Sequence, residues 1–328
     1  MARIKQHLLG IAKMIVAGLL IWWLVESGTL DLSALGVFWE RPILLVANFA
    51  FFAFSNVIVA LRWRLLLGLA GVELSLRRAM ALQLVGAFFN VAMPGNIGGD
   101  VLKTIYVARD VDTEQRATVF AITLLDRVVA LAGLVATAAI LTFEPHGAVW
   151  GDARFHQVAT AIAVLAVVTL LGPLSVLLII RRYGSRMDRW ASGKTWIGRI
   201  ISQLVLCARL VSARLGALLA SLGLAMAIHV IGIMWFTALA TEITAQDVSL
   251  SSMASVYPLG MLSTLLPISY AGFGVGHIAF EQLFAMVGLH GGATVLNVYL
   301  VGLTIPCVVG VIPYFTLRRE VQISPEST

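Results

Sequence analysis

The sequence FNVAMPGNIGGDVLK, residues Phe89–Lys103, interrupts a run of apolar residues, Ala79–Met93, with a proline and a glycine. Proline removes a backbone donor and glycine removes the side chain, so we expect a helix to break here. Two more glycines follow, and Asp100 and Lys103 then lie one helical turn apart. In hydrocarbon, bare peptide groups and charges are costly unless they are buried in protein or line a wet cavity. The stretch therefore predicts a broken helix that carries a functional site; the alternative is an ordinary Pro-Gly turn at a membrane surface.

The composition is that of a membrane protein. Of the 328 residues, 59% are hydrophobic and only 12% are charged, whereas globular domains carry about 25% charged residues. This predicts an all-α polytopic membrane protein. The net charge of +6 does not indicate nucleic-acid binding, because basic residues of membrane proteins gather in loops beside lipid headgroups. We expect no metal and no cofactor, because no metal-ligand or nucleotide-binding spacing is present.

The hydrophobic stretches fall into two classes by length. A full span needs about 20 apolar residues, whereas stretches of about 10–14 are more often re-entrant. Those long enough to cross are Leu8–Val25, Ile43–Leu61, Ala117–Phe143, Val158–Ile180, Leu215–Ala240 and Thr294–Phe315. Two adjacent pairs are shorter: Ala79–Met93 with Ile97–Ala108, and Met253–Pro267 with Phe273–Leu289. We therefore predict about six full spans and two re-entrant helical hairpins, 79–108 and 253–289.

The loop charges predict the orientation. The two ends of the chain and the loops near 62–78, 103–116 and 181–214 are basic, whereas the intervening loops carry acidic residues. The positive-inside rule places every basic loop, and both termini, in the cytoplasm. This arrangement holds only if the two hairpins dip into the membrane from opposite faces. Opposed broken hairpins are typical of an inverted repeat with its substrate site near the midplane.

The rest of the domain organisation follows from the same pattern. We expect a single transmembrane domain over residues 1–320 and a short cytoplasmic tail, 321–328. In the loop 181–214, basic residues alternate with tryptophan and isoleucine. Such a mixture favours an amphipathic helix on anionic lipid, and a solvated charged loop is the alternative.

The first hairpin tip offers a set of candidate binding residues: Asn90, Pro94, Gly95, Asn96, Gly98, Gly99, Asp100 and Lys103. A helix that restarts after the two glycines would point its free N–H groups at the tip, which favours an anion such as phosphate. Lys103 would add a mobile point charge. Asp100 fits two roles, as a helix N-cap and as a substrate-binding or proton-binding group.

Asp126 and Arg127 lie about ten residues into the next span, at a depth where charges need partners. Adjacent helical residues point about 100° apart, so these two are poor partners for each other. Asp100 is the candidate counter-charge for Arg127, and phosphate binding is the alternative role of this arginine.

The second tip offers a further candidate set: Pro267, Ser269, Tyr270, Gly272, Gly274, His277 and Glu281. His277 and Glu281 are four residues apart and share a helix face. The pair could relay protons, or it could form a hydrogen-bonded lock between helices.

Four blocks of sequence carry a resemblance to a known family. They are RWRLLL (Arg62–Leu67), NVAMPGNIGGDVLKTIYVARD (Asn90–Asp110), LLDRVVAL (Leu124–Leu131) and LPISYAGFGVG (Leu266–Gly276). In their order and spacing the chain resembles the lysylphosphatidylglycerol synthase transmembrane family, also called flippase-like. The family often has Arg where this chain has Lys103, and Arg-Glu where it has Gly276-His277.

The resemblance implies a multi-span protein that moves a polar lipid between leaflets. The lipid is aminoacylated phosphatidylglycerol in fused synthase-flippases, and a polyprenyl-phosphate carrier, a hopanoid-type or another polar lipid in stand-alone members. The fused enzymes carry an aminoacyltransferase domain after the membrane part, and this chain ends soon after its last span. We therefore expect a transporter and not an enzyme.

The leading hypothesis is a flippase of the bacterial cytoplasmic membrane that holds an anionic or zwitterionic lipid headgroup between the hairpin tips. The cations expected to hold the headgroup phosphate are Arg62, Arg64, Lys103, Arg109 and Arg127. Asp100, His277 and Glu281 would balance charge or couple transport to protons. One alternative is an intramembrane lipid-modifying enzyme that uses these three residues and Asp126. The other is a non-transporting membrane subunit of a lipid or envelope biosynthesis complex.

Overall fold

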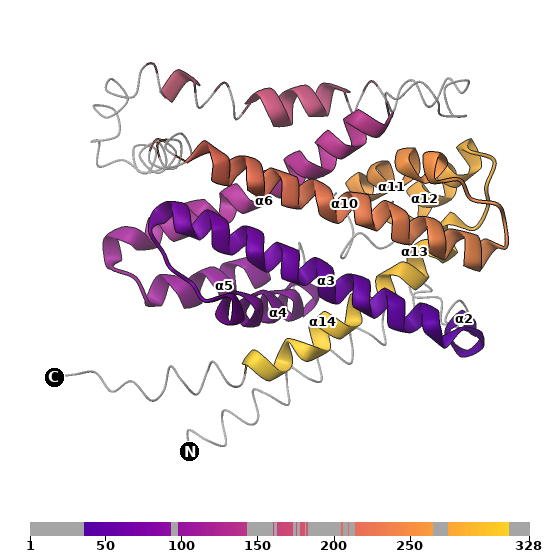
Figure 1. Cartoon of the computed structure of the whole chain (residues 1–328), viewed down its shortest axis with the longest axis horizontal. Helices are drawn as coiled ribbons and strands as arrows, with labels where there is room; N and C mark the ends of the chain where they lie inside the picture. The colour runs from indigo at the N-terminus through magenta and orange to yellow at the C-terminus, as the bar shows by residue number, and fades with distance from the viewer. Residues whose placement is uncertain are drawn as a thin grey trace.

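The computed structural model describes residues 36–92, 98–142, 214–264 and 275–314, with shorter pieces at 160, 163–172, 175, 178–180, 182, 205 and 209. The regular structure of these residues is helical, with no strand among them, which confirms the all-α class. The long helix α3 (Pro42–Leu67) is preceded by the short α2 (Gly36–Glu40) and followed by the 3-10 turn η2 (Gly68–Ala70). Figure 1 shows α3 and α10 (Leu215–Thr244) side by side along the long axis of the molecule.

Within the described residues, four helical segments are long and apolar enough to cross a membrane: Pro42–Leu69, Gln115–Leu141, Leu215–Thr244 and Gly292–Tyr314. They coincide with four of the predicted spans. The predicted span Leu8–Val25 lies outside the described residues, and Val158–Ile180 is described only in part, including the π-helix η4 (Val167–Leu171). The predicted loop 181–214 lies almost wholly outside them, and the tail 321–328 does so completely.

Contacts at their two ends show that α3 and α10 are antiparallel. Arg41, at the start of α3, forms an ion pair with Glu242 near the end of α10. At the other end, Arg214 precedes α10 and donates a hydrogen bond to the carbonyl of Gly68, 3.2 Å away. The helix α6 (Thr113–Thr142) packs against both of them.

The first predicted hairpin is an antiparallel helix pair, α4 (Leu76–Ala92) and α5 (Gly98–Arg109). The Gly99 backbone meets Gly86 so closely that a Cβ on Gly99 would lie 1.9 Å from the Gly86 oxygen. The side chains of Gln83 and Lys103 meet further from the tip. With 17 and 12 residues, the helices are about 25 and 18 Å long. Each is shorter than the roughly 30 Å hydrocarbon core of a bilayer.

The second predicted hairpin has the same form in α11 (Leu250–Thr264) and α12 (Val275–Met286), of 15 and 12 residues. Gly276 lies against Thr264 near the tip, and Gly260 lies against the Phe280 ring further away. These two contacts show that α11 and α12 are antiparallel. Both predicted pairs of short helices are therefore present as hairpins.

The last apolar segment is broken, which the sequence analysis did not predict. It consists of α13 (Gly292–Val301) and α14 (Thr304–Val309), followed by a further helical turn to Tyr314. Proline lacks an N–H and clashes with the carbonyl four residues earlier. Pro306 cannot donate to the carbonyl of Gly302, and α13 ends just before it, at Val301. Pro313 cannot donate to the carbonyl of Val309, where α14 ends.

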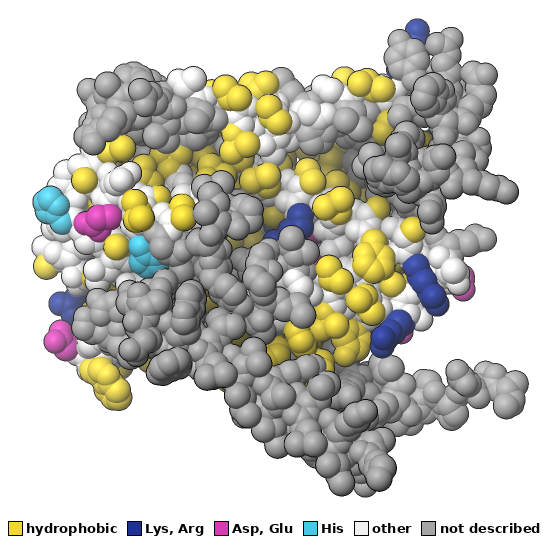
Figure 2. All heavy atoms as spheres, turned by 180° about the vertical axis from the view of Figure 1, so that it is seen from behind, with side chains coloured by type: hydrophobic (Ala, Val, Ile, Leu, Met, Phe, Trp, Pro, Cys, Tyr) yellow, Lys and Arg dark blue, Asp and Glu magenta, His cyan; other side chains and the backbone are white. Residues whose placement is uncertain are grey.

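The buried apolar residues form two clusters, each associated with one hairpin. One cluster contains Trp63, Leu82, Val85 and Val107, around α4 and α5. The other contains Phe236, Tyr257, Phe280 and Tyr299, around α11, α12 and α13. Figure 1 shows the two hairpins near opposite ends of α3. Figure 2 shows that apolar side chains cover much of the described surface on one face, as expected for contact with lipid.

We predict that Gly99→Ala lowers the midpoint of thermal unfolding in detergent by about 5 °C, because its Cβ would force the hairpin apart. Gly86→Ala is the matched control, because a Cβ there would lie 3.3 Å from the nearest atom, the Gly99 oxygen. Equal midpoints for the two variants would contradict the close contact between these helices.

Candidate functional site

Five charged side chains form three ion pairs, and we call them the charged cluster: Arg62, Asp100, Lys103, Asp126 and Arg127. They come from α3, α5 and α6. Asp126 lies 13 residues after the start of α6, which is about 20 Å along the helix. All five are candidates from the sequence, and the structure pairs Arg62 with Asp126, and Asp100 with Lys103 and Arg127.

Arg62 and Asp126 form a buried two-bond ion pair. Arg62 Nε lies 2.7 Å from Asp126 Oδ1, and a terminal nitrogen of the guanidinium lies 3.2 Å from Oδ2. Both side chains are 6% exposed. A charge buried without a partner costs several kcal/mol, so this pair fixes α3 against α6. Arg62 is engaged with a carboxylate here and does not face an open cavity.

Lys103 is also buried, with 2% of its surface exposed. Its Nζ lies 2.8 Å from Asp100 Oδ1 and donates to Gln83 Oε1 at 3.2 Å. The ammonium also lies 4.8 Å from the centre of the Trp63 ring, within the range of a cation–π contact. Lys103 thus has three partners in the structure, a carboxylate, an amide oxygen and an aromatic ring.

Asp100 joins the two remaining cations. Its second carboxylate oxygen pairs with Arg127 Nε, so the predicted counter-charge of Arg127 is confirmed. The carboxylate is 14% exposed, whereas the Arg127 side chain is 43% exposed. Arg127 is thus the member of the charged cluster that reaches the surface of the protein.

The helix carrying Asp100 is capped by a different residue. Asn90 Oδ1 accepts a hydrogen bond from the Gly99 N–H at 2.8 Å, which satisfies one of the donors left open at a helix start. Asp100 lies in the first turn of α5, where its charge also suits the helix dipole. Asn90 therefore takes the capping role that was one of the two weighed for Asp100, and Asp100 itself pairs with Lys103 and Arg127. Its substrate-binding or proton-binding role stays a prediction.

Two other candidate arginines lie outside the charged cluster. Arg64 donates from Nε to the Leu74 carbonyl at 2.6 Å, and Arg109 is exposed as the last residue of α5. Eight further candidates lie outside the described residues: Pro94, Gly95, Asn96, Pro267, Ser269, Tyr270, Gly272 and Gly274. Gly98 begins α5.

In the second hairpin, His277 and Glu281 contact different parts of α13. The imidazole Nε2 of His277 lies 2.6 Å from Asn297 Oδ1. Glu281 accepts hydrogen bonds from the backbone N–H groups of Gly291 and Ala293, at 3.4 and 2.9 Å. Both side chains thus link α12 to α13 by hydrogen bonds. This agrees with one of the two roles left open from the sequence, a hydrogen-bonded lock between helices; the other role, a proton relay, stays a prediction.

Several further residues contact the charged cluster or the helices around the second hairpin and were not predicted from the sequence. Trp63 and Gln83 hold Lys103, and a lone glutamine inside an apolar stretch is a signal that could have been used. In the other half, the buried Asn48 accepts from Trp235 Nε1 at 2.9 Å and donates to the Val298 carbonyl at 2.9 Å. The buried contacts described in that half are mostly neutral hydrogen bonds, whereas the first half holds the buried ion pairs.

The family of the chain is given by comparison. A family model described as the lysylphosphatidylglycerol synthase TM region matches residues 10–312. Because this match covers most of the sequence, the chain belongs to that family and is a membrane protein of a lipid-related group. Comparisons with curated proteins and with solved structures gave no match.

We predict that Asp126→Asn or Arg62→Met destabilises the protein by about 3–5 kcal/mol, because either change leaves one buried charge unpaired. The double variant R62M/D126L should regain most of this loss, since it leaves no charge behind. Thermal unfolding of the purified variants in one detergent measures the effect.

The exposed pair of Arg78 and Asp110 provides the control, with side chains 40% and 46% exposed. Asp110→Asn should change stability by less than about 1 kcal/mol. A double variant that loses the sum of the two single effects would mean that the buried pair has no coupling.

Proposed function

We propose that this protein moves a phosphate-bearing lipid between the two leaflets, and that the lipid headgroup passes the charged cluster. The observation that carries the proposal is the charge balance of that cluster. It holds three cations and two carboxylates, and Arg127 reaches the surface. Among these five side chains the cations outnumber the carboxylates by one, and a single phosphodiester charge would make the numbers equal.

The arrangement of Asp100 suggests how a headgroup is held and released. Its carboxylate bridges Lys103 and Arg127, so a phosphate can replace it at Arg127 while Lys103 keeps its carboxylate partner. Arginine binds phosphate in a bidentate manner. The exchange leaves no cation unpaired, which matters where unpaired charges are expensive. The acyl or isoprenoid tails stay in the bilayer throughout.

We further propose that the two hairpins are re-entrant and enter from opposite faces of the membrane, as an inverted repeat. Three observations support this: the helices are short, each pair is antiparallel, and the pairs lie near opposite ends of α3. Trp63, near the end of α3, meets Lys103 of the first hairpin. Asn48, near the start of α3, meets Val298 on α13, which packs against the second. Broken helices at such positions line the substrate site in transporters.

The distribution of charge supports an orientation. Arg64, Arg78 and Arg214 contact residues at one end of the bundle, whereas Glu242 and Glu281 lie towards the other end. By the positive-inside rule the basic end faces the cytoplasm. We propose on this basis a location in the bacterial cytoplasmic membrane with both termini in the cytoplasm.

The proposal is a transporter and not an enzyme. An enzyme acting on a lipid would need its carboxylates and histidine together at one depth. Asp100 and Asp126 are paired with cations in the first half, whereas His277 and Glu281 contact α13 in the second. A coupling of transport to protons would use the titratable groups of these two sites. Where the family often has Arg-Glu, this chain has Gly276-His277 and so lacks one positive charge in the second hairpin. We propose that this difference affects which lipid headgroup is accepted.

The test is transport of a panel of headgroup-labelled lipids in proteoliposomes. We predict that one lipid class moves and that Arg127→Gln slows it by about tenfold or more, because a phosphate partner is lost. Asp100→Asn should have a similar effect, and Lys103→Arg should retain transport because it keeps the charge.

Arg78→Gln is the matched control, since it removes an arginine from an exposed ion pair outside the charged cluster. Only variants with the elution profile of the wild type in gel filtration are compared. Transport at the wild-type rate by well-folded Arg127→Gln and Asp100→Asn would contradict the proposed role of the charged cluster.

A further inference from the structure

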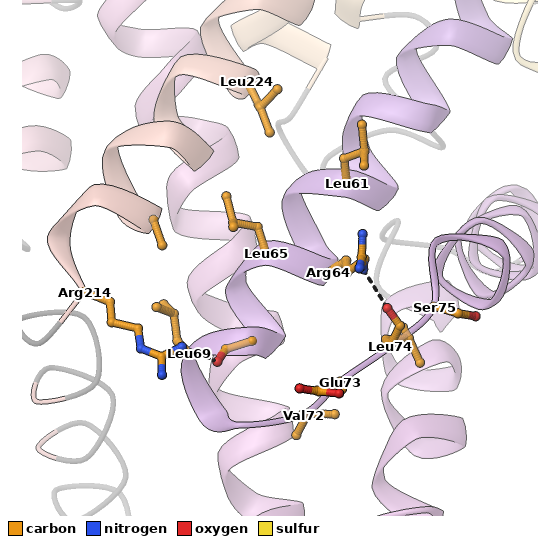
Figure 3. A pocket seen from close by; sticks show the side chains of 12 residues that line it. Leu61, Arg64, Leu65, Leu69, Val72, Glu73, Leu74, Ser75, Arg214 and Leu224 are labelled. Atoms are coloured by element: carbon orange, nitrogen blue, oxygen red, sulfur yellow. Dashed lines mark hydrogen bonds between the residues drawn. The ribbon is translucent and has the colours of Figure 1, made fainter.

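A pocket of about 850 Å³ lies between α3 and α10 at the basic end of the bundle. We call it the lateral pocket and define it by Leu61, Arg64, Leu65, Glu73, Arg214 and Leu224. Figure 3 shows Leu61 and Leu224 on the side of the pocket towards the middle of the helices and Glu73 on the side of the connecting loop, with the two arginines between. Its volume lies within the range of about 300–1,000 Å³ that is usual for ligand sites.

The lateral pocket is separate from the charged cluster. On a helix, successive residues are rotated by about 100°, so residues 61, 64, 65 and 68 share one face of α3. Trp63, which contacts Lys103, points from the opposite face, and Arg62, which pairs with Asp126, points to the flank of α3. None of the residues of the charged cluster lines the lateral pocket.

The two arginines of the lateral pocket are positioned by the backbone. Arg64 donates through Nε to the Leu74 carbonyl, and Arg214 donates through a terminal nitrogen to the Gly68 carbonyl. Each guanidinium carries five N–H donors, and each of these two uses one of them in the contacts seen within the described residues. The remaining donors, and the excess of two arginines over one glutamate, suit an anion with several acceptor oxygens.

We propose that the lateral pocket binds a phosphate-bearing membrane lipid, with its phosphate between Arg64 and Arg214 and a chain along Leu61, Leu65 and Leu224. Leu61, Leu65 and Leu224 line the side towards the middle of the helices, and the two arginines lie nearer the connecting loop, where Leu69, Val72 and Leu74 also line the pocket. In the proposed orientation the arginines therefore lie nearer the membrane surface than these three leucines, as a lipid phosphate does relative to its chains. The site holds a lipid of the leaflet at the basic end before it reaches the charged cluster. This inference rests on the proposed orientation and transport function.

The experiment uses a phosphatidylglycerol with a photoreactive group in its acyl chain, reconstituted with the full chain in liposomes. After illumination, mass spectrometry of peptides locates the crosslinks. We expect them at Leu61, Leu65 or Leu224, and we expect R64Q/R214Q to reduce them by about tenfold through lost phosphate contacts. Leu224→Trp should reduce them by filling the pocket. Arg116→Gln, an exposed arginine outside the pocket, should leave them unchanged.

Two results would overturn the inference. One is crosslinking at these leucines that is equal in R64Q/R214Q and wild type, or absent in both. The other is binding of inorganic phosphate to purified protein that R64Q/R214Q abolishes while no lipid crosslinks there, which would assign the arginines to a soluble anion. Arg127→Gln separates the two proposals: crosslinking should persist in it although transport is lost. Crosslinking without transport in the wild type would contradict only the proposed function.

Discussion

The structure depends on one constraint: a charge inside an apolar helical bundle must have a partner. The carboxylate of Asp100 is the partner of two cations, Lys103 on its own helix and Arg127 on α6. The carboxylate of Asp126 is the partner of Arg62 on α3. These three ion pairs connect α3, α5 and α6 at a depth where unpaired charges would destabilise the fold. Within the charged cluster three cations face two carboxylates, and the proposed function rests on this composition.

The two halves of the molecule share an architecture and differ in chemistry. Each has a hairpin of short helices with its own apolar cluster, and the hairpins lie at opposite ends of α3. The first half is held by ion pairs. The second is held mainly by neutral hydrogen bonds, such as those of Asn48 and that between the hydroxyls of Tyr257 and Tyr299 at 3.1 Å. In the proposed function, the headgroup is therefore recognised by the charged side chains of the first half.

Much of this arrangement could be predicted from the sequence, because it follows from local patterns. The short helices follow from stretch length, and the pairing of Asp100 with Arg127 follows from the need for a counter-charge. The partner of Arg62 is 64 residues away, and hydrophobic patterns do not specify which helices become neighbours. The burial of Lys103 depends on Trp63 from another helix in the same way. The break in the last segment was predictable in principle, since Pro306 and Pro313 stand in the sequence.

The central claim is that the two broken hairpins bring their tips into the membrane from opposite faces. Labelling of single cysteines tests it most directly, in a chain whose Cys207 and Cys307 are replaced by alanine. A cysteine at Asn96 should react slowly and only from the cytoplasmic face, and one at Ala271 slowly and only from the outer face. Asp112→Cys, in an exposed loop, gives the rate of a surface position. Reaction of either tip at that surface rate, or of both tips from the same face, would contradict the account.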